Sequence, residues 1–225
     1  MWIPLVVLVA RFGFGWHFEG LRESRREFKR LRTASSAPLL VCANHLTMVD
    51  SILIAIALGS PWRYVTRYGS LAWNTPAREN FANTWYTRVI VYLAKCVPVS
   101  RGGDRREIGV VLSKITWLIG IGEVALIFPE GGRSRTGRVD ADAVTYGVGR
   151  IVRALPDCRV LCVYLRGEEQ KSYSFLPARK DRFRVSVQSM EPKTAMRGLR
   201  GSLDVSKQIL TQLADMERRH FNDRQ

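Results

Sequence analysis

The 225-residue chain has few residues of the kinds that hold metals or form disulfides. It contains four cysteines and three histidines. Cys158 and Cys162 form a C-x3-C pair, but no second cysteine pair and no nearby histidine completes a zinc site. All four cysteines lie in or beside apolar runs, which indicates reduced core residues and a reducing compartment rather than a disulfide framework.

The N-terminus lacks an uninterrupted apolar run of the roughly 20 residues that a membrane-spanning helix needs. The stretch MWIPLVVLVARFGFGWHFEG is apolar but interrupted by Arg11, and it does not fit a signal peptide. We expect residues 1–32 to form a basic, aromatic helical segment that associates with a membrane; the alternative is a helix packed on the protein's own core. Five aromatic residues of this segment are of the kind that favours the lipid–water interface: Trp2, Phe12, Phe14, Trp16 and Phe18.

Acidic residues are scarce relative to basic ones. The chain has 20 Asp and Glu against 35 Lys and Arg, which gives a formal net charge of +15 at pH 7. Such an excess indicates an anionic partner: nucleic acid, an acidic membrane surface or an anionic small molecule. The hydrophobic fraction of 46% is enough to fill the core of one sizeable domain.

Strands alternate with helices through the middle of the chain. Short apolar or alternating runs predict strands at residues 38–43, 62–68, 96–100, 124–128, 159–167 and 182–190. Helical spacing predicts helices at residues 18–31, 50–58, 104–120, 141–155 and 202–221. This order predicts an α/β fold with a largely parallel central sheet and flanking helices, in a single catalytic domain over residues 33–225.

Functional sites of such sheets collect at the carboxyl ends of the strands. His45, Arg101 and Glu130 each lie within two residues of the end of a predicted strand. We therefore expect these three residues to meet at one edge of the sheet.

His45 follows an apolar run, and Asp50 comes five residues later. Five residues of helix rotate by about 500°, so the two side chains can meet only if the chain turns between them, as at a strand-to-helix junction. The helix dipole would favour an ionised Asp50. A carboxylate bonded to one imidazole nitrogen leaves the other nitrogen as a base, which suits a hydroxyl group attacking an acyl carbon.

Asp50 also has a purely structural explanation. Thr47-x-x-Asp50 resembles a helix capping box, with Asp where Glu or Gln is preferred. Capping accounts for Thr47 and Asp50 but leaves His45 unexplained.

A covalent nucleophile is the competing catalytic hypothesis. Ser51 lies in the predicted helix, and the chain has no G-x-S-x-G elbow. Cys42 lies in an apolar strand, where a thiolate is disfavoured. We therefore expect direct attack by the acceptor without an acyl-enzyme.

A glycine- and arginine-rich loop, FPEGGRSRTGR, covers residues 128–138. Glycines let backbone N–H groups approach an anion, and arginines bind phosphate oxygens bidentately. Arg101 in VPVSRGG offers the same chemistry. The structural alternative is a glycine turn with solvated arginines, and neither loop matches a P-loop or a dinucleotide fingerprint. Glu130, an anion among cations, is expected to hold an arginine or to bond a substrate hydroxyl.

Four sequence blocks together resemble those of the glycerolipid acyltransferases, the lysophosphatidate acyltransferase family. NHLTMVD resembles the N-H-x4-D block, CVPVSRGG the second block and FPEGGRSRTG the F-P-E-G-T-R-S block of that family. RVLCVYLRG resembles the fourth, apolar block. The blocks occur in the family order and span residues 39–167.

The resemblance implies roles for individual residues. His45 would be the general base and Asp50 its orienting partner. Arg101 and Arg133 would hold the anionic head group of the acceptor. The loop residues that would shape the acceptor pocket are Glu130, Gly131 and Gly132.

The resemblance also implies a reaction. A fatty acyl group would move from acyl-CoA or acyl carrier protein to a lysophospholipid, with lysophosphatidate giving phosphatidate, and no metal or redox cofactor would be needed. The expected partner is an anionic membrane surface rather than nucleic acid. The expected location is peripheral or monotopic, on the cytoplasmic face of a membrane.

Two departures from the family pattern bear on the acceptor. Gly132 stands where the family usually has Thr or Ser, which removes a hydroxyl and loosens the loop. The second block lacks the usual glycine and phenylalanine before Arg101. A different lysolipid, or an alcohol or amine of a specialised lipid pathway, is therefore an alternative acceptor. The remaining alternatives are a hydrolase that uses the same His–Asp pair, and a non-catalytic basic protein that binds membranes or nucleic acid.

Overall fold

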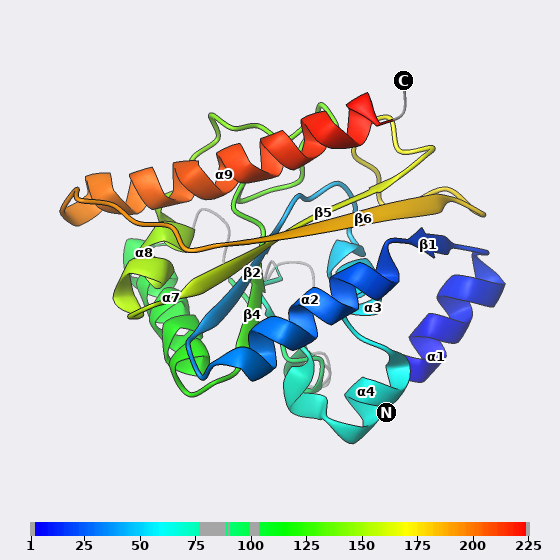
Figure 1. Cartoon of the computed structure of the whole chain (residues 1–225), viewed down its shortest axis with the longest axis horizontal. Helices are drawn as coiled ribbons and strands as arrows, with labels where there is room; N and C mark the ends of the chain where they lie inside the picture. The colour runs from blue at the N-terminus through cyan, green and yellow to red at the C-terminus, as the bar shows by residue number, and fades with distance from the viewer. Residues whose placement is uncertain (1–2, 77–88, 90, 100–103, 224–225) are drawn as a thin grey trace.

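Figure 1 shows the computed structural model of the chain, which describes residues 3–76, 89, 91–99 and 104–223. These residues contain a six-stranded sheet with the strand order β1-β6-β5-β2-β4-β3. All neighbouring strands are parallel except β5 and β6, which are antiparallel. The strands are β1 His17–Glu19, β2 Leu39–Ala43, β3 Trp73–Asn74, β4 Val124–Ile127, β5 Arg159–Gly167 and β6 Arg182–Met190. The predicted α/β fold with a largely parallel sheet is confirmed.

Helices cover both faces of the sheet, with α2 and α9 on opposite sides in Figure 1. One face packs against α2 (Leu21–Ala34) and α3 (Asp50–Leu58). The other face packs against α7 (Arg105–Gly120), α8 (Tyr146–Ala154) and α9 (Gly198–Asn222). The remaining described helices are α1 (Ile3–Leu8), the π-helical η1 (Val9–Gly13), α4 (Pro61–Thr66) and the 3-10 helix η2 (Tyr68–Ser70).

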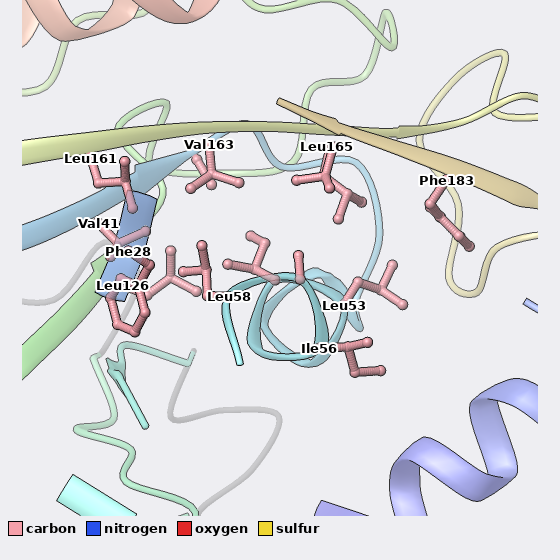
Figure 2. Close-up of a cluster of buried hydrophobic side chains, with 14 of the residues drawn as sticks. Phe28, Val41, Leu53, Ile56, Leu58, Leu126, Leu161, Val163, Leu165 and Phe183 are labelled. Atoms are coloured by element: carbon pink, nitrogen blue, oxygen red, sulfur yellow. The ribbon is translucent and has the colours of Figure 1, made fainter. Parts of the chain in front are cut away.

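The central strand β2 is buried on both faces, so its residues alternate between two hydrophobic cores. Val41 packs with α2 and α3, and Cys42 packs with α7, α8 and α9. Figure 2 shows the first core, in which Val41, Leu126 and Leu161 of the sheet lie near Leu58 of α3. A continuous apolar run is what a parallel strand covered on both faces requires. This position fixes the end of β2 rigidly in the middle of the molecule.

The N-terminal segment contributes to the sheet as well as to helices. Phe18 lies in β1 and stacks on Phe183 of β6, with ring centroids 5.1 Å apart. Trp16 is only 5% exposed, and its Nε1 donates to the Ala178 carbonyl at 2.8 Å. Trp16 therefore packs in the protein core rather than at a lipid interface, and Phe18 is partly buried against the same core.

The rest of this segment departs from the prediction in a different way. The helix predicted from residue 18 begins at Leu21, because Gly20 adopts a positive φ of 81° after β1. Phe12 is 77% exposed, Phe14 is partly buried, and Trp2 lies outside the described residues. Within the described part of the chain, no helix combines the length and the apolar character needed to cross a bilayer. Membrane association of residues 1–32, and the division at residue 33, stay predictions.

The strand predicted at residues 62–68 is wrong, because this segment forms α4 and η2. The Ser60 hydroxyl accepts a hydrogen bond from Arg63 N at 3.2 Å, and Pro61 occupies the first turn. Both are helix-start signals. Tyr64 then packs inward, and its hydroxyl donates to the Ala55 carbonyl of α3 at 2.7 Å.

Two other predicted elements have different bounds. The segment at residues 96–99 forms no named strand, but it pairs with the residues after Trp73 through a bridge between Cys96 and Asn74 and through hydrogen bonds from Val97 N to the Asn74 carbonyl and from Val99 N to the Pro76 carbonyl. Helix α8 begins at Tyr146 rather than at residue 141. Asp140 explains the later start, because its carboxylate accepts from Asp142 N and Ala143 N and closes a turn there.

Gly149 of α8 provides a test of the contact between α8 and α9. A Cβ at this position would collide with the Ser202 carbonyl of α9. We expect Gly149→Ala to destabilise the fold by about 1–3 kcal/mol through overpacking. Thermal unfolding measures the loss. Gly109→Ala in α7 is the matched control, because the nearest atom would lie 4.0 Å away, and it should leave stability equal or slightly higher.

Candidate active site

The ends of β2 and β4 bring two of the predicted site residues together. His45 follows β2, and its ring stacks on Phe128, the first residue after β4, with centroids 4.0 Å apart at 14°. The His45 carbonyl also accepts a hydrogen bond from Ser134 N at 2.9 Å. Glu130 therefore lies on a loop that is attached directly to His45. Arg101, the third residue expected at this edge, lies outside the described residues.

His45 and Asp50 meet across the turn from β2 to α3. The His45 Nδ1 atom lies 2.9 Å from Asp50 Oδ2, and both residues are buried, at 8% and 4% exposure. If Nδ1 carries the proton and donates to Asp50, then Nε2 is the nitrogen that can accept a proton. His45 borders a cavity, so this base can reach a molecule bound there.

Asp50 accepts three further hydrogen bonds from the turn. Its Oδ2 accepts from Leu46 N at 2.6 Å and from Thr47 N at 2.8 Å, and its Oδ1 accepts from Thr47 Oγ1 at 2.5 Å. The helix α3 begins at Asp50 with Val49 at its N-cap, so these bonds close the turn before the helix and do not form the capping box that Thr47-x-x-Asp50 resembles. The structural and the catalytic explanations of Asp50 are thus compatible, because one carboxylate closes the turn and orients the imidazole.

Asn44 connects this turn to the neighbouring strand. Its side-chain amide donates to the Leu165 carbonyl at 3.0 Å and accepts from Leu165 N at 2.9 Å. The buried side chain thus continues the pairing of β2 with β5 beyond the last strand residue. This contact gives the asparagine before His45 a structural role that the sequence analysis did not anticipate.

Glu130 is a partly buried carboxyl group with incomplete hydrogen bonding. Its Oε2 accepts from Asp140 N at 3.4 Å, and its Oε1 has no hydrogen-bond partner among the described residues. Burial raises the pKa of Glu130 to about 7, against the smaller opposing effects of the Asp140 and His45 backbone amides. A carboxyl group of this kind suits a hydrogen bond to a polar group of a bound molecule.

The arginines of the loop differ in their surroundings. Arg133 is half-buried; its Nη1 donates to the Ser174 carbonyl at 3.4 Å, and its guanidinium lies 5.5 Å from the centre of the Tyr173 ring. Arg138 instead lies over Phe221 of α9, at 3.7 Å from the ring centre. Arg133 is therefore the arginine of this loop that stays closest to the predicted anion-binding role.

A cavity of about 1030 Å³ opens beside His45. Gly131 and Gly132 border it together with His45, and a Cβ at Gly132 would meet no atom within 4 Å. Glu130 and Arg133 are not among its lining residues. Most of the wall is apolar. The helices α1, α3 and α7 and the end of β4 contribute part of it, including Val7, Ile52, Ile56, Val111, Leu112, Ile115 and Ile127.

Thiolates are disfavoured at this site. Cys96 borders the cavity, and burial raises the pKa of its thiol to about 11. Cys42 is fully buried in β2, and burial raises the pKa of its thiol well above the ordinary value. Ser51 borders the cavity, but no hydrogen bond among the described residues links its hydroxyl to His45. The geometry therefore supplies a base without a neighbouring activated nucleophile.

Sequence reasoning missed the loop between β5 and β6. Its Ser174 N donates to the Leu46 carbonyl at 3.0 Å, and its Phe175 carbonyl accepts from Met48 N at 3.2 Å. The loop thus supports the turn that carries His45 through two backbone hydrogen bonds. It has no periodic pattern or motif, so only the fold reveals this contact.

Comparison with known proteins agrees with the geometry of the site. A family model described as Acyltransferase matches residues 18–196. A search of curated proteins finds no match to the chain. The matched span includes His45, Asp50 and the loop after β4, and it ends just before α9.

Glu130 predicts a pH-dependent stability difference. With its pKa raised to about 7, the folded state keeps a proton that the unfolded chain releases near pH 4.5, so the folded state loses stability as the pH rises through this window. Glu130→Gln should therefore raise Tm by about 2–4 °C at pH 8 and change it little at pH 5. Thermal unfolding at both pH values measures this. Exposed Glu191→Gln is the control, and an equal shift for Glu130→Gln at both pH values would contradict the assignment.

Proposed function

We propose that this chain, which belongs to the glycerolipid acyltransferase family, transfers a fatty acyl group from acyl-CoA or acyl carrier protein to a lysophospholipid, with lysophosphatidate as the acceptor. The observation that carries the proposal is the His45–Asp50 pair, 2.9 Å apart, at the edge of a large apolar cavity. The pair supplies a base, and the cavity supplies room for an acyl chain.

The reaction follows from the position of the base. The acceptor hydroxyl gives its proton to His45 Nε2 as its oxygen attacks the thioester carbonyl carbon. Asp50 stabilises the imidazolium that forms. The tetrahedral intermediate then collapses, the carbon–sulfur bond breaks, and the imidazolium returns the proton to the leaving thiolate. No acyl-enzyme is needed, which agrees with the buried thiol of Cys42.

The acyl chain of the donor would occupy the apolar part of the cavity. Side chains of α3 and α7 form much of the wall, and Ile52 and Ile115 are examples from each helix. The volume of about 1030 Å³ lies at the upper end of ordinary ligand pockets. An extended hydrocarbon chain matches a wall of this composition, because burying it removes apolar surface from water.

The acceptor would bind on the side of the loop after β4. Arg133 would hold its phosphate, with Glu130 bonding a hydroxyl group, and Arg101 would supply a second cation. The position of Ser134 supports this arrangement. Its backbone N–H donates to the His45 carbonyl, and Arg133 is the residue before it, so Arg133 lies on a segment that is attached to the base.

One observation favours a second candidate for the acceptor. Gly132 leaves open space at the cavity wall, since a Cβ there would meet no atom within 4 Å. A head group larger than phosphate would fit there. The second candidate is therefore an acyltransferase that modifies another lysolipid, or an alcohol or amine of a specialised lipid pathway.

We further propose that the protein is peripheral or monotopic on the cytoplasmic face of an anionic membrane. Helices α1 and α4 carry exposed apolar side chains, with Leu5 at 63% and Trp62 at 73% exposure, and Phe12 of η1 adds a third at 77%. The same two helices border the cavity through Val7 and Tyr64. Lipid contact on this side, together with the net charge of +15, would bring lipid substrates to the cavity.

A product assay tests the catalytic proposal. Purified protein is supplied with long-chain acyl-CoA or acyl carrier protein and a panel of lysolipids, alcohols and amines, and products are identified by mass spectrometry. We expect phosphatidate from lysophosphatidate, a loss of at least about 100-fold in kcat for His45→Ala, and a strong loss for Asp50→Asn. Circular dichroism checks that both variants are folded.

Each other outcome of this assay has a distinct meaning. A different acylated product would reassign the acceptor and keep the mechanism. Free fatty acid alone would indicate a hydrolase. Near-normal turnover by folded His45→Ala would remove His45 from the mechanism. No product with any donor, from protein that still binds anionic vesicles, would favour a non-catalytic binding protein.

Flotation with anionic vesicles tests the membrane proposal. The double variant Phe12→Ser, Trp62→Ser should reduce the vesicle-bound fraction severalfold, because two exposed apolar side chains of the proposed contact are removed. Leu199→Ser is the matched control, because Leu199 is 61% exposed but lies on α9, on the other face of the sheet. Equal losses in both variants would contradict the assigned surface.

A further inference from the structure

Helix α9 lies beyond residues 18–196, the span that the acyltransferase model matches, yet it buries a charged residue against the active-site loop. Glu217, in the last turns of α9, is 7% exposed. Most of the buried side of α9 is apolar, as expected for a helix that covers a sheet. A buried carboxylate on such a helix is costly unless several partners bond to it.

The partners of Glu217 come from the loop after β4 and from β5. Its Oε2 accepts a hydrogen bond from Val139 N at 3.1 Å. Its Oε1 accepts from the Tyr164 hydroxyl at 3.0 Å and lies 3.8 Å from Arg166 Nη1. Tyr164 and Arg166 are themselves buried, at 1% and 5% exposure. The carboxylate thus joins α9, β5 and the loop in one buried network.

Arg166 also bonds to the loop after β4 itself. Its Nη1 donates to the Gly137 carbonyl, and its Nη2 donates to the Gln170 carbonyl at 2.5 Å. Phe221, one turn after Glu217, adds a contact from α9, because the Arg138 guanidinium lies 3.7 Å from its ring centre. Three consecutive residues, 137–139, are therefore held by groups outside the loop.

Two short paths lead from residues 137–139 to the site. On one path, Asp140 N, next to Val139, donates to Glu130 Oε2 at 3.4 Å. On the other path, the Ser134 hydroxyl bonds to both the N–H and the carbonyl of Arg138.

Ser134 completes the second path. Its backbone N–H donates to the His45 carbonyl at 2.9 Å, and Arg133 precedes it in the chain. The contacts of α9 with the loop are thus connected, through short hydrogen-bonded paths, to Glu130 and Arg133, the residues that we expect to bind the acceptor.

We propose that Glu217 is a positioning residue for the acceptor side of the site. It fixes residues 137–139, and through them it positions Glu130 and Arg133 on the loop that Ser134 attaches to His45. This inference rests on the proposed acyltransfer and on the binding of the acceptor by this loop. Because a buried ion pair adds little net stability compared with apolar residues of similar size, we infer that the pair contributes a defined loop geometry.

Kinetics with separate variation of the two substrates test this role. Glu217→Gln keeps the shape of the side chain but removes the charge that faces Arg166. We expect the KM for the acceptor to rise about 5- to 20-fold, while the KM for the acyl donor stays within about twofold, because the donor site uses the apolar cavity. Asp215→Asn is the matched control on α9, because Asp215 pairs with Arg218 at the surface, and both KM values should stay unchanged.

A double variant separates positioning from stability. Glu217→Leu with Arg166→Met replaces the pair with apolar side chains and should recover thermal stability relative to either single change. The acceptor KM should nevertheless stay high, because the bonds to Val139 N and to the Gly137 carbonyl are lost. Recovery of the acceptor KM together with Tm would show a purely structural role and would overturn the proposal, as would an unchanged acceptor KM in Glu217→Gln.

The test distinguishes failure of this inference from failure of the proposed function. Wild-type protein that forms no acylated product would refute the function before Glu217 is considered. Wild-type turnover with normal acceptor KM in the Glu217 variants would refute only the positioning role. Equal increases in the KM of donor and acceptor would indicate a general distortion of the site and would likewise contradict the proposal.

Discussion

The four hydrogen bonds that Asp50 accepts hold the turn between β2 and α3, and the whole site depends on this turn. Two come from the backbone N–H groups of Leu46 and Thr47, one from the Thr47 hydroxyl, and one joins the carboxylate to the His45 imidazole. Because all four partner groups can donate a hydrogen bond, residue 50 requires a side chain whose two polar atoms both accept hydrogen bonds. An asparagine would turn an NH2 group toward one of these donors. The same requirement therefore serves the fold and the orientation of the base.

The sheet supplies the frame in which this turn acts. β2 is buried between two layers of helices, and its carboxyl end, like that of β4, lies at one edge of the sheet. The loop after β4 is attached to the turn through Phe128 and Ser134, and the loop after β5 is attached through Ser174. Glu217 of α9 accepts a hydrogen bond from Val139 N and so attaches α9 to the loop after β4. Contacts of this kind keep the base and the binding loop in fixed relative positions, which catalysis by proximity and orientation of the reactants requires.

Much of this arrangement follows from local sequence patterns, and the exceptions have physical causes. The bounds of α3, β5 and β6 agree with the prediction, because unbroken apolar or alternating runs end at clear turn residues there. The segment at 62–68 was predicted as a strand because its short mixed pattern resembles one, but the Ser60 cap and Pro61 start a helix. β1 was missed because three residues are too few to show a period, and its strand nature comes from pairing with β6.

The site shows the same division between local and long-range information. The junction carrying His45 and Asp50 could be predicted because both residues lie within a few positions of a strand end and a helix start. Asn44, Ser134 and Glu217 could not, because their roles come from partners 121, 89 and 78 residues away in the chain: Leu165, His45 and Val139. The roles of Arg101, Glu130, Gly131, Gly132 and Arg133 in acceptor binding stay predictions.

The protonation pattern of the His45 imidazole tests most directly whether this residue is the base. The chain has only three histidines, so ¹⁵N NMR of histidine-labelled protein gives few signals, and a His45→Ala sample identifies those of His45. At a pH where the His45 imidazole is neutral, we expect a proton on Nδ1, bonded to Asp50, and an unprotonated Nε2. Asp50→Asn should change this pattern while leaving the signals of His17 and His220 in place. A neutral His45 with its proton on Nε2 in the wild-type protein would contradict its role as the base.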